Sequence, residues 1–314
     1  MRQENTVSEK MVPVEHIPKR PLILGGDTGI LGPALRYTLQ SAGSTPLTAD
    51  NALTGEWNSE AWCRYVERMQ PDIVINALCS FDVQRAEQEP SKAYFWNKEL
   101  PCIVARALRR VGVGLVSFSS DCVFDGRQQV PYTVGDHPNP LSVYGQSFLA
   151  GERALQDSGL SDLLIIRSSW LFGPFSPNFV DWVLFRGKES QCLQVEHDQI
   201  GSPTYTLDLA GYALQLITHR VTGIHHVCNS GQASWCELAA ETLSTCGFNC
   251  TVQAVTSSGS KAKLRPHFSV LDPKQSMALA RIKPRPWPKA LREYIFRFHS
   301  EHIAQEETPT KSRC

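Results

Sequence analysis

Short apolar runs alternate with helix-like patterns through the first half of the chain. The apolar runs are Pro21–Gly25, Pro46–Ala49, Asp72–Ala77, Gly114–Ser119 and Leu163–Ser168. Between them, apolar residues recur at helical spacing in Gly29–Ala42, Glu60–Met69, Ser91–Arg110 and Tyr144–Gln156. Continuous apolar runs are typical of strands buried on both faces, and their alternation with helices predicts parallel pairing. We therefore expect an α/β fold with a doubly wound parallel sheet, in which Pro101 bends its helix.

The pattern loosens after Trp170, and the elements expected there are shorter. They are helices at Asn178–Arg186, Leu207–His219, Ser234–Cys246 and Ala290–His302, and strands at Gly223–Val227 and Thr251–Val255. This part is too short for another doubly wound sheet, so we expect a smaller C-terminal substrate lobe that can exchange a strand with the sheet. The division we predict is a flexible arm at residues 1–20, a dinucleotide-binding domain at 21–170, a lobe mainly from 171–304, and a polar tail at 305–314.

Composition narrows the class of protein without naming it. The 314 residues carry no formal net charge, which gives no reason to expect nucleic acid or a membrane surface as a partner. No apolar run approaches the roughly 20 residues of a membrane-spanning helix, and the polar N-terminus does not resemble a signal peptide, so we expect a cytoplasmic protein. The ten cysteines form no CxxC pair or His/Cys cluster. We therefore predict neither a disulfide framework nor a metal site.

A glycine loop lies between the first expected strand and helix. It reads Gly26-Asp27-Thr28-Gly29-Ile30-Leu31-Gly32. Gly26 allows a tight turn, Gly29 lets backbone N–H groups approach a pyrophosphate, and Gly32 lets the helix pack on the strand. The alternative is a glycine-rich turn without a ligand, but the strand and helix on either side favour a dinucleotide.

The second expected strand bears on which dinucleotide is bound. It ends at Asp50, 24 residues beyond Gly26, where a carboxylate suits the ribose hydroxyls of NAD. No arginine or lysine lies between Ser44 and Asn58 to meet a 2′-phosphate. We expect NAD(P)H as the cofactor, with a slight preference for NADH.

A second polar group follows the strand Gly114–Ser119 and leads to a tyrosine. The segments are Ser119-Ser120-Asp121-Cys122-Val123-Phe124-Asp125-Gly126 and Asn139-Pro140-Leu141-Ser142-Val143-Tyr144-Gly145, continuing to Glu152. A hydroxyl at a strand end and a tyrosine opening the next helix resemble the active site of extended short-chain dehydrogenases. The pattern is most similar to the dTDP-4-dehydrorhamnose reductase family, with Ser-Thr-Asp-Tyr-Val-Phe-Asp-Gly and Asn-Pro-Leu-x-x-Tyr-Gly-x-x-Lys-x-x-Gly-Glu.

The resemblance extends from about Pro21 to Leu291. Further matching segments are Arg167–Gly173, Asn178-Phe179, Asp198–Thr204, Gly231–Trp235 and Arg265–Asp272. The run Asp-Gln-Ile-Gly-Ser-Pro-Thr at Asp198–Thr204 is specific, whereas many dehydrogenases share the glycine loop. In the family these segments shape a sugar-nucleotide pocket, so the resemblance implies a nucleotide-sugar substrate and, as a possibility, a homodimer.

The resemblance also implies a set of site residues. The catalytic pair is Tyr144 and Ser120. The cofactor would contact Gly26, Gly29, Ile30, Leu31, Gly32, Asp50, Asn76, Ala77 and Tyr144. The substrate would contact Asp121, Cys122, Phe148, Trp170, Asn178, Phe179, Gln199, Ser202 and Thr204. Two residues have structural alternatives, since Trp170 can be plain core and Asn97 can tie a helix to a strand as well as act in catalysis.

One position departs sharply from the family. Phe148 stands where the family has the lysine that holds the nicotinamide ribose and lowers the pKa of the tyrosine. A cation about 4 Å away at an effective dielectric of 20 is worth roughly 4 kcal/mol, or about three pK units. Without it the pKa of Tyr144 should stay nearer the ordinary value of about 10. Ser120 in place of threonine is a mild change, and Cys122 in place of tyrosine is less mild.

Three interpretations stay open at this point. The first is a reductase of reduced or altered activity. The second is a cofactor-binding protein without turnover, like the regulatory β subunit of methionine adenosyltransferase, a relative that keeps the lysine. The third is a lyase, epimerase or cyclase that uses the pocket without net hydride transfer. The matched segment Asp198–Thr204 favours an enzyme over a bare binding subunit.

Overall fold

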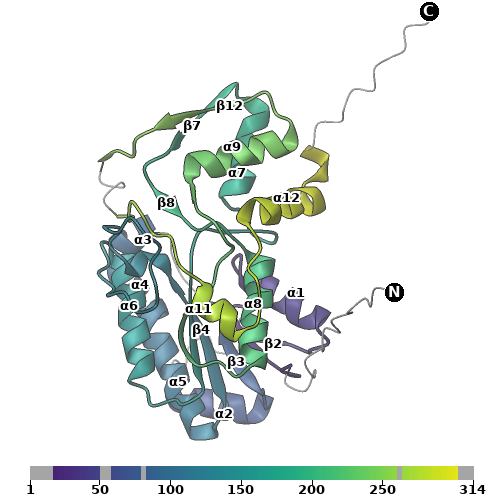
Figure 1. The fold of residues 1–314 in the computed structure, drawn as a ribbon. Coiled ribbons are helices and arrows are strands. Elements are labelled where there is room, and N and C mark those ends of the chain that lie inside the picture. The colour runs from purple at the N-terminus through teal and green to yellow at the C-terminus, as the bar shows by residue number, and fades with distance from the viewer. Residues whose placement is uncertain (1–16, 50–57, 79–82, 260–263, 303–314) are drawn as a thin grey trace, which may run out of the picture.

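A computed structural model describes residues 17–49, 58–78, 83–259 and 264–302. Its centre is a six-stranded sheet in the order β10-β5-β4-β3-β1-β2, in which every neighbouring pair is parallel. Helices cover both faces, and a second group of helices and short strands lies beyond one end of the strands (Figure 1). The predicted fold class, a doubly wound parallel sheet, is confirmed.

The strands of the sheet and of the smaller ladders have short, mostly buried sequences. Those of the central sheet are β1 Leu22–Leu24, β2 Leu47–Thr48, β3 Ile73–Asn76, β4 Gly114–Ser120, β5 Leu163–Ser168 and β10 Gly223–His226. The others are β6 Leu171–Phe172, β7 Cys192–Glu196, β8 Ile200–Gly201, β9 Thr204–Tyr205, β11 Ala233–Ser234 and β12 Thr251–Val255.

The helices fall into the two groups that Figure 1 shows. Those of the sheet region are α1 Gly32–Ser41, α2 Ser59–Met69, α3 Val83–Gln88, α4 Pro90–Tyr94, η1 Phe95–Glu99, α5 Leu100–Val111, η2 Asp121–Val123, α6 Val143–Gln156, α8 Thr206–Thr218 and α11 Lys274–Leu279. Those of the smaller lobe are α7 Phe179–Glu189, α9 Trp235–Cys246, α12 Trp287–Phe298 and η3 Ser300–His302.

Alternating residues of each strand feed two separate hydrophobic cores. Leu22 and Leu24 of β1 pack with helices α2 and α5, whereas Ile23 between them packs with α1 and α8. Successive side chains of a strand point to opposite faces, so a run with no polar interruption must be covered on both sides. This explains why the strands read as continuous apolar runs in the sequence.

The helix expected at Ser91–Arg110 does not simply bend at Pro101. It passes from α4 through a π-helical turn, η1, into α5, with the Leu100 amide bonded to the Phe95 carbonyl. Pro101 has no N–H to offer the Asn97 carbonyl, so the ladder widens there instead of breaking. A Cβ on Gly151 would lie 1.9 Å from that Asn97 carbonyl oxygen, so glycine is what lets α6 pack against the π-turn.

The chain crosses to the smaller lobe after β5 and returns. Helix α8 packs on α1, and β10 pairs with β5 at the edge of the sheet before the chain leaves again. In the lobe, β7 and β12 form a parallel ladder from Cys192↔Thr251 to Glu196↔Val255. Elements that lacked a clear sequence signal include α3, β7 and α11. None of the helices in the described part of the chain is both long and apolar enough to span a bilayer.

The end of the expected N-terminal arm is attached to the body. The Lys19 and Arg20 amides donate to the Asp72 carboxylate, and Ser44 Oγ donates to the Pro18 carbonyl at 2.6 Å. Residues 17–20 therefore belong to the folded body. Residues 1–16 and the tail beyond His302 lie outside the described residues.

Candidate active site

The carboxyl ends of four strands meet above the point where the strand order reverses. The chain runs from β1 outward to β2, then crosses back to β3, β4 and β5, so a crevice opens between the ends of β1 and β3. A cavity of about 680 Å³ lies there. Its walls include Gly29 of the glycine loop, Ser120 at the end of β4, Tyr144 of α6 and Trp170 after β5. Segments far apart in the sequence thus meet at one site large enough for a small ligand.

The glycine loop has the geometry that a phosphate group needs. Gly29 is exposed with φ +66°, and a Cβ there would meet nothing within 4 Å. Gly32 opens α1, and its Cβ would lie 1.7 Å from the Gly25 carbonyl oxygen, which only glycine avoids. The loop therefore holds the N-terminus of α1 tightly on β1 and leaves open space at Gly29. These residues fit a dinucleotide pyrophosphate, as the sequence predicts.

A short turn after β4 carries the polar residues of the cavity floor. Ser120 caps this turn, accepting from the Cys122 amide at 3.2 Å, and its hydroxyl donates to Asp121 Oδ1 at 3.1 Å. Burial raises the pKa of Asp121 above its usual range, although the Ser269 hydroxyl and the Arg265 charge act the other way. Burial and the nearby Asp121 also raise the pKa of Cys122 to about 12, so Cys122 is a neutral thiol.

A glycine allows helix α6 to lie close against this turn. A Cβ on Gly145 would lie 2.0 Å from the Cys122 carbonyl oxygen, so no larger residue fits. Ser142 caps the helix by accepting from the Gly145 amide at 3.3 Å. The close approach brings Tyr144, one residue before this glycine, to the cavity beside Ser120. The predicted catalytic pair is therefore brought together.

Phe148 occupies the next turn of α6 and touches Tyr144. Their ring centroids are 4.9 Å apart with planes at 71°, an edge-to-face contact. Phe148 lines the cavity with 6% of its surface exposed. Behind it lies an apolar cluster that includes Val123, Phe124 and Leu271. The place of the family's lysine is thus part of a hydrophobic wall.

Polar contacts beneath the site hold α6 in position. Asn97 Nδ2 donates to Ser147 Oγ at 2.9 Å, and this hydroxyl donates to the Tyr144 carbonyl at 2.7 Å. Asn97 therefore ties the π-turn to α6, rather than a helix to a strand. Further along α6, Glu152 and Arg167 form a bidentate ion pair, each 3% exposed, with N–O distances of 2.8 and 2.6 Å.

The same buried network makes a testable contribution to acid stability. His226 faces Arg167 at 3.4 Å and the Tyr132 carbonyl at 2.9 Å, and burial lowers its pKa from 6.5 to about 3. The unfolded chain therefore binds one more proton between these pH values, so this contribution to stability falls as the pH drops from 6.5 towards 3.

We expect His226→Gln, which does not titrate, to flatten the pH dependence of the free energy of unfolding between pH 4 and 6. The change is at most about 1.4 kcal/mol per pH unit. Urea unfolding of both proteins across this range measures it. Asp121, whose raised pKa acts in the opposite direction, is common to both proteins. Parallel curves for the two proteins would contradict the assignment.

Aromatic residues from the smaller lobe form the facing wall. Trp170 and Trp235 stack with centroids 3.6 Å apart and planes at 3°, and Phe179 leans on Trp235 at 4.7 Å. A Cβ on Gly201 would lie 2.4 Å from the Trp170 indole, which explains the glycine in the Asp198–Thr204 segment. Gln199 accepts a hydrogen bond from Trp235 Nε1 at 3.2 Å. Trp170, at φ 48°, is therefore a cavity wall rather than plain core.

A second cavity of about 690 Å³ continues the site towards the lobe. The two cavities share Val83, Phe179, Trp235 and Arg265, so they are adjoining parts of one cleft. Gln199 lines the second part, together with Ser257 and Glu196. Arg265 brings a guanidinium to the junction of the two parts. The cleft is therefore long enough for an elongated ligand.

Other predicted site residues lie behind the walls. Asn76, at the end of β3, donates to Ser117 Oγ and accepts from the Leu78 amide, and the Ala77 amide donates to the Leu24 carbonyl. Ser202 and Thr204 are fully buried and hold the segments around Ser169 and Leu271. Within the described part of the chain, Asn76, Ala77, Ser202 and Thr204 therefore line neither of these two cavities. Asp50 lies outside the described residues.

Several residues of the cavity walls are not among the site residues predicted from the sequence. Arg265 and Trp235 stand in segments that resemble the family, so the motif could have indicated them. Val83 comes from α3, which has no sequence signal of its own. Arg36 of α1 forms an ion pair with Asp27 of the glycine loop, so a cation does lie near this loop although none lies between Ser44 and Asn58.

The fold and the cleft define a Rossmann-type protein with the architecture of extended short-chain dehydrogenases. Residues 20–300 match the model of the family described as the RmlD substrate binding domain, and the chain belongs to this family. The spore coat polysaccharide biosynthesis protein SpsK of Bacillus subtilis (strain 168) is 36% identical over 276 residues, covering 87% of this chain and 96% of that protein.

Two dTDP-4-dehydrorhamnose reductases are similar to this chain to a comparable degree. A dTDP-4-dehydrorhamnose reductase of Streptomyces griseus is 33% identical over 284 residues, covering 88% of this chain and 93% of that enzyme. The crystal structure of dTDP-4-dehydrorhamnose reductase from Bacillus anthracis, in complex with NADP, superposes with a TM-score of 0.82 at 31% identity, covering 89% of this chain and 99% of that one. The resemblance found in the sequence is confirmed, and the predicted class of enzyme is that of this family.

Proposed function

We propose that the chain is an NAD(P)H-dependent reductase of a 4-keto-6-deoxy nucleotide sugar, of reduced activity because Phe148 replaces a lysine. The observation that carries the proposal is the convergence of Gly29, Ser120 and Tyr144 on one cavity. Each has a distinct role, since a phosphate-binding loop, a strand-end hydroxyl and a phenol together suit reduction of a ketone.

The cofactor part of the proposal rests on the loop. The open space at Gly29, its positive φ and the N-terminus of α1 suit a pyrophosphate, and the cavity runs from there to Tyr144. When bound, the reduced nicotinamide supplies the hydride. The slight preference for NADH stays a prediction. The Arg36 guanidinium, which is paired with Asp27, is a nearby cation that could attract a 2′-phosphate. Comparing kcat/KM for NADH and NADPH decides between them.

The chain's own groups would move the proton. The Tyr144 hydroxyl would donate its proton to the ketone oxygen of the substrate, and solvent would then return a proton to the phenolate. The Ser120 hydroxyl can turn from Asp121 to donate to the same oxygen, since a hydroxyl rotates freely. Phe148 offers Tyr144 an apolar neighbour instead of a cation, so the phenol gives up its proton reluctantly.

The substrate part rests on the second cavity. A nucleotide sugar is elongated, and the cleft continues from Tyr144 past Arg265 to Gln199. The stacked pair Trp170–Trp235 and Phe179 provide flat faces for a base or a sugar ring, and the Arg265 guanidinium suits a diphosphate. In this proposal the sugar lies on the Trp170 side of the cleft and the nucleotide on the Gln199 side.

Tyr144→Phe tests the assignment directly. We expect wild type to oxidise NADH or NADPH slowly with a dTDP-4-keto-6-deoxy sugar, and the variant to lose about 10²- to 10⁴-fold in kcat. Tyr37→Phe, on an exposed position of α1, is the control and should keep wild-type turnover.

Other outcomes separate the remaining interpretations. Full activity in Tyr144→Phe would remove the tyrosine as the acid. Coenzyme binding with no turnover of any sugar would favour a binding subunit. A changed sugar with no net coenzyme oxidation would favour a lyase, epimerase or cyclase.

A further inference from the structure

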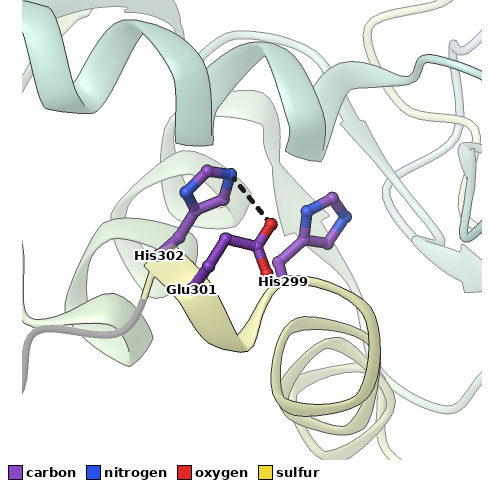
Figure 2. Close-up of side chains that lie close together, drawn as sticks. All are labelled: His299, Glu301 and His302. Atoms are coloured by element: carbon purple, nitrogen blue, oxygen red, sulfur yellow. Dashed lines mark ion pairs between the residues drawn. The ribbon is translucent and has the colours of Figure 1, made fainter.

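Three potential metal ligands lie together at the end of α12, far along the chain from the catalytic residues. They are His299, Glu301 and His302, and one ligand atom of each lies within 4.8 Å of the others (Figure 2). No metal site is predicted from the sequence, because the chain has no CxxC pair and no His/Cys cluster. This cluster instead joins two imidazoles with a carboxylate.

The backbone explains why the two imidazoles meet. Helix α12 ends at Phe298, and the His302 amide donates to the His299 carbonyl at 2.9 Å, which forms the 3₁₀ turn Ser300–His302. Residues three apart eclipse one another in a 3₁₀ turn, unlike in an α-helix. The two rings accordingly face each other at 14°, with centroids 5.7 Å apart.

His299 is already oriented as a metal ligand would be. Its Nε2 lies 3.1 Å from Asp181 Oδ1 on α7, and Asp181 is itself held by the Tyr294 hydroxyl at 2.6 Å and by Asn178 Nδ2 at 2.7 Å. A carboxylate that accepts from Nε2–H leaves the Nδ1 lone pair free, and Figure 2 shows the other ring nitrogen facing Glu301 and His302. Metal-bound histidines commonly donate to a carboxylate in this way.

The second histidine and the carboxylate are spaced like two ligands of one ion. His302 Nε2 lies 3.6 Å from Glu301 Oε1, whereas its Nδ1 is buried without a hydrogen-bond partner. This separation is too long for a good hydrogen bond. It is close to the roughly 3.4 Å that separates two ligands of a tetrahedral zinc with bonds of about 2.0–2.1 Å. Glu301 is 63% exposed and free to move inward.

We propose that His299 Nδ1, His302 Nε2 and the Glu301 carboxylate bind one Zn²⁺ ion, with water at the fourth position. Two imidazoles and one carboxylate suit zinc better than magnesium or calcium, which prefer oxygen ligands only. The charge of Lys188 opposes a cation there, and the charges of Glu301 and Asp181 offset it. The bound ion would hold the turn after α12, and His299 links this turn to Asp181 of α7, whose N-cap Asn178 lines the substrate cavity.

Calorimetry of the full chain with Zn²⁺ alone tests the site. We expect one ion per chain in wild type, and at least about tenfold weaker binding in His299→Ala and in His302→Ala. Asp181→Asn keeps the ligands but alters the support of His299, so it should weaken binding by about 10- to 100-fold. The control is His137→Ala, an exposed histidine outside the cluster, which should bind like wild type.

A cobalt spectrum separates this site from a cysteine site. Cys192 is exposed, and its strand partner Thr251 directly follows Cys250. The thiols of Cys192 and Cys250 are therefore a pair that could compete for the metal ion. Co²⁺ at the proposed site gives ligand-field bands without thiolate-to-cobalt charge transfer. Zinc binding that survives in both histidine variants, a thiolate charge-transfer band, or no binding by wild type would each overturn the proposal. Thermal unfolding of the variants without metal shows whether they still fold.

Discussion

Phe148→Lys is expected to raise the turnover of a 4-keto nucleotide sugar by about two to three orders of magnitude. The lysine would restore the missing cation beside Tyr144, lower the pKa of its phenol and provide a donor for the nicotinamide ribose. Phe148 lines the cavity and touches the Tyr144 ring, so a side chain that leaves the helix at this position reaches the place where the charge acts.

The substitution also costs stability. Phe148 packs with Phe124, Leu149 and Leu271, and lysine removes that packing and draws a charge towards an apolar wall. We expect a loss of about 1–3 kcal/mol in the free energy of unfolding. Phe148→Met is the matched control, because methionine is unbranched and similar in length to lysine but carries no charge. It should share part of the stability loss and gain no turnover.

Steady-state kinetics and a pH profile together decide the case. If the gain arises through Tyr144, the alkaline limb of kcat in Phe148→Lys moves to lower pH, because a more acidic phenol deprotonates earlier. The double variant with Tyr144→Phe should lose the gain. A folded Phe148→Lys protein with unchanged or lower turnover would show that the cation is not what the site lacks. It would favour redox-neutral chemistry, with Phe148 as a wall that keeps the site dry.

The parallel sheet was predictable because its strands are short and apolar on both faces. Strand β5 has the predicted bounds, and in the smaller lobe so has β12. The capping box at Ser234 is equally local, since the Ser234 hydroxyl and the Glu237 carboxylate satisfy each other's backbone amides. Features set by neighbours in sequence are readable from sequence.

Features set by distant partners were not readable. Pro101 signals a disturbed helix, but the close packing of α6 on the π-turn depends on Gly151 of that other helix. Strand β7 acquires its pairing from β12, about sixty residues later in the chain. In the proposed metal cluster, the orientation of His299 depends on Asp181 of α7, which the spacing of His299 and His302 does not reveal.

The residues of the candidate site also fall into those that the sequence places correctly at the cavity and those that it does not. Ser120 and Tyr144 were predicted by motif, and Gly145 explains physically why the two segments meet. Ser202 belongs to an equally specific motif and yet is buried, where it holds the backbone of Leu271. A motif marks residues that a fold needs at a site without separating those that face the ligand from those that support the wall.

Gly29→Asp is expected to abolish dinucleotide binding. The loop places Gly29 at the N-terminus of α1 with open space where its Cβ would be, so the space suits a phosphate, and an aspartate would put a like charge into it. The backbone at φ +66° adds strain for most side chains. Asparagine has nearly the same shape as aspartate, carries no charge and tolerates this left-handed conformation.

Gly29→Asn is therefore the control that separates charge from shape. In calorimetry with NADH and NADPH, we expect no measurable binding by Gly29→Asp and weakened but measurable binding by Gly29→Asn. Equal loss of binding in both variants would mean that the added volume at residue 29, rather than the added negative charge, excludes the ligand. Wild-type affinity in Gly29→Asp would place the pyrophosphate elsewhere in the cleft and remove the loop from the cofactor site, because a fixed negative charge beside bound phosphate cannot be neutral in its effect.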